Sequence, residues 1–70
     1  MNKLFLNKCV YPKITILTAI KAFSSLCSIK LFEQNKYYIC EFNNCTYGMT
    51  ETKKEFENYL IDLINTDSLI

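Results

Sequence analysis

The side chains that could do chemistry here are four cysteines, eight lysines and seven carboxylates, because the chain has neither histidine nor arginine. Histidine is the commonest general base, and arginine is the usual bidentate partner of phosphate and guanine. A nucleophilic cysteine needs an adjacent base or an electropositive setting, and only Cys9 has a lysine, Lys8, directly beside it. A glycine-rich phosphate loop is absent, since Gly48 is the only glycine. We therefore predict no catalytic residue and no cofactor.

The cysteine spacing is not that of a typical zinc site. Such sites usually contain two close pairs, such as Cys-x-x-Cys, whereas Cys40 and Cys45 have four residues between them and Cys9 and Cys27 are scattered. We therefore predict no metal site and four free thiols that act as small hydrophobic side chains. A tetrathiolate site assembled from distant segments is the alternative.

Length and composition predict one small domain, residues 1–70. The chain is 50% hydrophobic and 21% charged, which is ordinary for a globular protein. A net charge of +1 gives no field that would attract nucleic acid or an anionic membrane. No signal peptide is recognisable, and Lys21 interrupts the most apolar stretch, residues 14–29. We expect a cytoplasmic protein with no nucleic-acid or membrane partner.

Hydrophobic patterning predicts a strand and then a helix in the first part of the chain. The strand covers residues 4–10, and Pro12 is well placed to start a helix. Apolar side chains at Ile16, Ile20 and Phe23 recur at helical spacing, so the helix is expected over residues 12–25.

The middle of the chain predicts a hairpin. Residues 27–33 and 36–43 alternate in polarity, with a turn centred on Gln34 and Asn35. This turn places Leu31 opposite Tyr38 and Ile29 opposite Cys40. One face then carries Ile29, Leu31, Tyr38, Cys40 and Phe42.

A second helix is expected to follow the loop at residues 43–48. Thr52 and Glu55 form a capping-box pattern, with Thr50 as an earlier alternative cap, and the helix runs to about Asn65. Its apolar stripe consists of Phe56, Tyr59, Leu60, Leu63 and Ile64.

These elements predict an α+β fold of the order βαββα, with both helices on one face of a three-stranded sheet. The first strand can pair with the second strand or with the third. We favour the third, which gives a ferredoxin-like two-layer sandwich that lacks its last strand and leaves the first strand with an unpaired edge.

The other sheet face is the predicted partner-binding site, because it gathers Phe5, Phe32, Tyr37 and Ile39. A homodimer stacked through this face is the first expectation, and a hetero-partner or a different strand register are the alternatives. Asn58 and Asp62, four residues apart on the second helix, are further candidates for a polar contact with a partner.

Two segments resemble the His-Xaa-Ser system protein HxsD family. In residues 11–23, Tyr11, Ile16, Ala19 and Phe23 match the family's pattern, and residues 56–62 are similar to its Phe-x-Asn-x-Leu-x-Asp motif. The family's Leu-Arg after the acidic residue is missing. The resemblance implies a role beside radical SAM enzymes that modify ribosomally made peptides.

We therefore predict a non-catalytic accessory module that binds a precursor peptide or the modifying enzyme. One alternative is a homodimeric structural protein with no peptide role. Another is a thiol or metal protein that uses the four cysteines.

Overall fold

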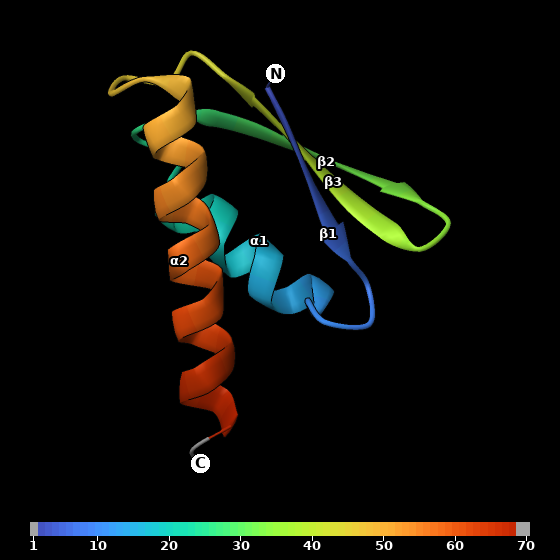
Figure 1. The fold of residues 1–70 in the computed structure, drawn as a ribbon. Helices are drawn as coiled ribbons and strands as arrows, with labels where there is room; N and C mark the ends of the chain where they lie inside the picture. The colour runs from blue at the N-terminus through green and yellow to red at the C-terminus, as the bar shows by residue number, and fades with distance from the viewer. Residues whose placement is uncertain (1, 69–70) are drawn as a thin grey trace.

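The computed structural model describes residues 2–68, and these form three strands and two helices (Figure 1). Residues 1, 69 and 70 of the expected domain lie outside the described residues. The sheet order is β1-β3-β2, with β3 antiparallel to both neighbours. The predicted α+β fold and the pairing of the first strand with the third are confirmed. The elements are β1 Lys3–Asn7, α1 Lys13–Ala22, β2 Ser28–Gln34, β3 Tyr37–Asn43 and α2 Met49–Ser68.

Both helices cover the same face of the sheet and form a single core with it (Figure 1). The Phe56 ring of α2 meets Phe42 of β3 edge-on at 5.2 Å and Phe23 at 5.3 Å. On α2, Thr52, Phe56 and Leu60 are buried at intervals of four, as one face of a helix requires. The buried core cluster consists of Leu6, Ile16, Ala19, Cys27, Cys40, Phe42, Phe56 and Leu60.

The first strand and first helix are shorter than expected. β1 ends at Asn7, because its side-chain Oδ1 accepts a hydrogen bond from the backbone N–H of Cys9 at 2.8 Å and starts a turn. Pro12 is the N-cap of α1 rather than its first helical residue. The helix ends at Ala22, and the N–H groups of Leu26 and Cys27 then bond to the Phe23 carbonyl, which turns the chain toward β2.

The predicted hairpin register is wrong by two residues. Leu31 pairs with Cys40 rather than with Tyr38, and Ile29 pairs with Phe42. The turn is centred one residue later, and Asn35 there has a φ of 33°, a conformation that asparagine tolerates well. An even shift keeps every side chain on its predicted face, so the core assignment is unaffected.

An ion-pair cluster fixes the end of the sheet near this hairpin. The Glu33 carboxylate accepts hydrogen bonds from the Nζ atoms of Lys13 and Lys8, each at 3.1 Å. The bonds from Lys13 and then Lys8 lower the pKa of Glu33. The Lys8 ammonium also lies 5.1 Å from the Tyr38 ring centre. The cluster joins the β1–α1 turn and α1 to β2, but its exposure limits its contribution to stability.

The second helix begins earlier than the capping pattern predicts. α2 starts at Met49, so Thr50 and Thr52 lie inside the helix and neither is its cap. Gly48 precedes the helix with a φ of 98°, a conformation in which most side chains would be strained. The N–H of Thr52 donates to the Gly48 carbonyl at 3.1 Å, which begins the helical hydrogen bonding. α2 also continues to Ser68, beyond the expected end near Asn65.

Candidate protein-binding surface

The sheet face opposite the helices, here called the outer face, carries three complete cross-strand rows of side chains. Alternation along the strands and the two registers define these rows. The middle row is apolar, one flanking row holds an aromatic hydroxyl between two amides, and the other holds a carboxylate between two lysines. The rows are Phe5–Ile39–Phe32, Asn7–Tyr37–Gln34 and Lys3–Glu41–Lys30.

The outer face brings together the four residues predicted to bind a partner there. Phe5 is 51% exposed, Phe32 is 47% exposed and Tyr37 is 43% exposed. The rings of Phe5 and Tyr37 meet edge-on, with their centres 6.1 Å apart. Ile39 is buried, yet it does not belong to the core cluster, because Phe5 and Phe32 flank it on the outer face. The result is one continuous apolar strip across the sheet.

The other two predicted binding residues are not part of this surface. Asn58 and Asp62 are exposed on α2, and α2 packs on the opposite face of the sheet. The backbone carbonyl of Asp62 accepts a hydrogen bond from the Thr66 hydroxyl at 2.8 Å. Any contact of Asn58 or Asp62 with a partner would therefore be separate from the outer face.

The free edge of β1 presents backbone hydrogen-bonding groups. The N–H of Phe42 donates to the Asn2 carbonyl at 2.7 Å, and the N–H of Lys8 donates to the Lys36 carbonyl at 2.9 Å. In an antiparallel pair such bonds recur at every second residue. The even-numbered residues of β1 therefore bond to β3, and the N–H and C=O groups of Lys3 and Phe5 point away from it.

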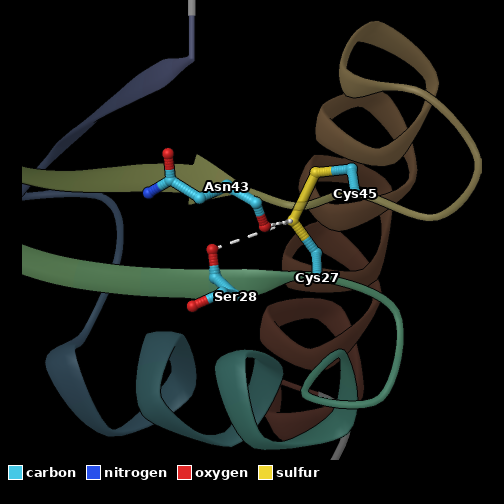
Figure 2. Close-up of a disulfide and its surroundings, with 4 residues drawn as sticks. All are labelled: Cys27, Ser28, Asn43 and Cys45. Carbon is cyan, nitrogen blue, oxygen red and sulfur yellow. Dashed lines mark hydrogen bonds between the residues drawn. A yellow bond between two sulfur atoms is a disulfide. The ribbon is translucent and has the colours of Figure 1, made fainter.

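A disulfide joins Cys27 and Cys45, so the prediction of four free thiols is wrong for this pair (Figure 2). Cys27 immediately precedes β2, and Cys45 lies in the loop between β3 and α2, with their Cα atoms 4.3 Å apart. The spacing of the cysteines gave no sign of this pair, because the bond reaches from the residue before β2 to a loop 18 positions later. The Sγ of Cys27 lies 3.3 Å from the Asn43 carbonyl oxygen, to which a thiol at Cys27 could donate after reduction of the disulfide.

The other two cysteines are free and differ strongly in their surroundings. Cys9 is exposed, whereas Cys40 is fully buried in the core, and this burial raises the pKa of the Cys40 thiol to about 11. Cys40 is therefore an inert thiol at neutral pH rather than a nucleophile.

We expect iodoacetamide to alkylate Cys9 in the native protein and to leave Cys40 unmodified until the chain unfolds. The folded pKa of Cys40 lies above its ordinary value of 9.0, so its protonated thiol stabilises the fold below pH 9, and this contribution is lost as the pH rises through about 11. Mass spectrometry of the alkylated protein, with and without denaturant, shows whether Cys9 is modified before Cys40. Equal labelling of Cys9 and Cys40 in the native state would contradict the burial.

The helix layer contains a shallow pocket near the disulfide. Its volume is about 180 Å³, below that of a typical ligand site. It is lined by Phe23, Leu26, Tyr47, Glu51, Thr52 and Glu55. Among residues 2–68, the structure groups no three histidine, cysteine or acidic side chains as a metal site would require.

The outer face, the β1 edge and the disulfide are thus the features from which a function can be argued. None of the helices in the described part of the chain has both the length and the apolar character to cross a membrane. Comparison with protein-family models, with curated proteins and with solved structures found no match to this chain.

Proposed function

We propose that the protein is a non-catalytic accessory module that binds an extended segment of a ribosomally made precursor peptide. The observation that carries this proposal is the free edge of β1, where Lys3 and Phe5 direct backbone groups away from the sheet. An extended peptide can add to such an edge as another strand and pair through its main chain.

The position of this edge supports the proposal. A strand added beside β1 occupies the place of the last strand of a ferredoxin-like fold, which residues 2–68 do not contain. The Phe5 side chain lies on the outer face beside the same edge and is half exposed, so it offers an apolar contact to alternate side chains of the added strand. Main-chain pairing gives affinity, and such side-chain contacts give selectivity.

The chemistry of the side chains favours binding over catalysis. There is no histidine in the chain, and its thiols are a disulfide pair, a buried thiol of raised pKa and the exposed Cys9. The maturation context comes from the resemblance of residues 11–23 and 56–62 to the HxsD family. In that context the modification is carried out by a separate radical SAM enzyme, and this protein acts as its partner.

We expect Lys3→Pro to weaken capture of the precursor peptide about two- to tenfold, because it removes one edge N–H donor. The N–H of Lys3 points away from β3, so proline is tolerated there as on other edge strands. The matched control is Lys3→Ala, which removes the charge but keeps the N–H. The probes are fluorescently labelled peptides made from short reading frames that lie next to the gene for this chain, and affinity is measured by fluorescence anisotropy.

Amide chemical shifts locate the binding site independently. On addition of the peptide, the backbone amides of Lys3 and Phe5 are expected to move more than those on the β2 edge. Equal affinities of the proline and alanine variants, with no shift along β1, would remove the basis of the proposal.

A second candidate is a structural homodimer with no peptide role, favoured by the exposed apolar strip of the outer face. Dimerisation with capture of neither precursor peptide nor modifying enzyme would select it.

A further inference from the structure

We infer that the outer face binds a second copy of this chain, with the two sheets stacked about a two-fold axis that crosses the strands. The axis runs along the middle row, Phe5–Ile39–Phe32. This inference does not depend on peptide binding at the β1 edge.

The exposed apolar side chains of the middle row favour burial of the outer face against another protein surface. Phe5 and Phe32 are each about half exposed on either side of the buried Ile39, and Tyr37 continues the apolar surface. A contiguous apolar patch on a small protein usually marks an interface. A two-fold axis lets one such patch serve both chains.

The charges on the flanking row argue against one of the two axes that keep the cross-strand rows in register. A two-fold axis between stacked faces lies in the plane between them, and two directions of that axis keep the rows of the two copies in register, one along the strands and one across them. An axis along β3 places Glu41 over Glu41 of the second copy, and Lys3 over its Lys30. Each of these contacts brings like charges together, which opposes association.

An axis across the strands makes the same rows complementary. Each residue of the middle row then stacks on its own counterpart, and the two flanking rows exchange places. Glu41 lies over Tyr37 of the second copy, whose hydroxyl can donate to the carboxylate. Lys30 lies over Gln34 of the second copy, so its ammonium meets an amide oxygen, and Lys3 lies over Asn7, whose Oδ1 already accepts the N–H of Cys9. Of these two arrangements, the charges therefore favour the one whose axis crosses the strands, and in it the outer face is complementary to a second copy of itself.

The size of the face predicts a weak dimer. Three strands about 4.8 Å apart and five residues of about 3.4 Å each give roughly 250 Å² in projection. Side-chain relief enlarges this area, yet it stays below the roughly 800 Å² per partner of a standard interface. We expect a dissociation constant in the micromolar range.

Substitution of Gln34 tests whether a second copy covers the outer face and whether the two-fold axis crosses the strands. Gln34 is exposed at the end of β2 and faces Lys30 of the second copy only if the axis crosses the strands. Gln34→Glu creates two ion pairs per dimer and is expected to tighten it about three- to tenfold. Gln34→Lys is expected to weaken the dimer by a similar factor. Sedimentation equilibrium of the full chain measures both.

Asn65→Asp on α2 is the matched control, since it makes the same amide-to-carboxylate change at an exposed position on the helix side. It should leave the dimer unchanged, whereas Phe32→Asp should give a monomer with unaltered circular dichroism. A chain that stays monomeric up to about 1 mM overturns the inference. A dimer whose dissociation constant is unchanged by both Gln34→Glu and Gln34→Lys also overturns it. Either result leaves the Lys3 test of peptide binding unaffected.

Discussion

Phe42→Ala is expected to lower the free energy of unfolding by about 3–5 kcal/mol, the cost of truncating a fully buried phenylalanine. The Phe42 side chain has no exposed surface, and its ring lies against Phe56 at 5.2 Å, so truncation removes the contact between β3 and α2. A core of this size supplies only about 3–5 kcal/mol in total. Under reducing conditions, the variant should therefore lose its cooperative unfolding transition, followed by circular dichroism in urea.

The matched control is Phe5→Ala, which makes the same change on the other face of the same sheet. Phe5 is 51% exposed, so its truncation should cost about half as much or less. If the two variants had equal unfolding midpoints, the division of the sheet into a core face and an outer face would be wrong.

Reduction of the Cys27–Cys45 disulfide is expected to lower the free energy of unfolding by about 3 kcal/mol. The two cysteines are separated by 18 positions, and closing a loop of that length restricts the unfolded chain by about this amount. The packing around the Cys27 sulfur is retained, because its thiol can donate to the Asn43 carbonyl in the reduced protein. Urea titrations with and without reductant measure the difference.

Two variants make the disulfide prediction specific. Cys45→Ala should match the reduced protein and become insensitive to reductant. Cys9→Ala changes an exposed free thiol and should behave as the unsubstituted chain. If reductant did not shift the unfolding midpoint and native alkylation modified Cys27 and Cys45, the disulfide would not be part of the protein in solution.

Alternation predicted the faces of the sheet correctly because it has a period of two. The hairpin register moved by two positions, from Leu31 opposite Tyr38 to Leu31 opposite Cys40, and this leaves the core set intact. The turn position itself depends on the left-handed conformation of Asn35 and on ion pairs from Lys8 and Lys13 to Glu33. Those contacts join distant segments and leave no local signal.

The candidate site was predictable only in part. Phe5, Phe32, Tyr37 and Ile39 were placed on one face by alternation alone, and the structure brings them together. The dimer that we propose depends on the registers of both strand pairs, so the strand pattern alone could not suggest the roles that we propose for Asn7 and Gln34. The disulfide was missed because its second cysteine lies in a loop whose path the sequence pattern does not define.

The disulfide also closes the hairpin into a covalent ring. Strands β2 and β3 and the turn between them lie inside the segment that Cys27 and Cys45 span. Lys36 is exposed at the tip of this ring. A protease that cuts after Lys36 would therefore yield two fragments that stay covalently linked by the disulfide while the protein is oxidised. The two fragments can separate only after a reductant opens the ring, so the oxidised protein can be cut at this exposed turn without being divided.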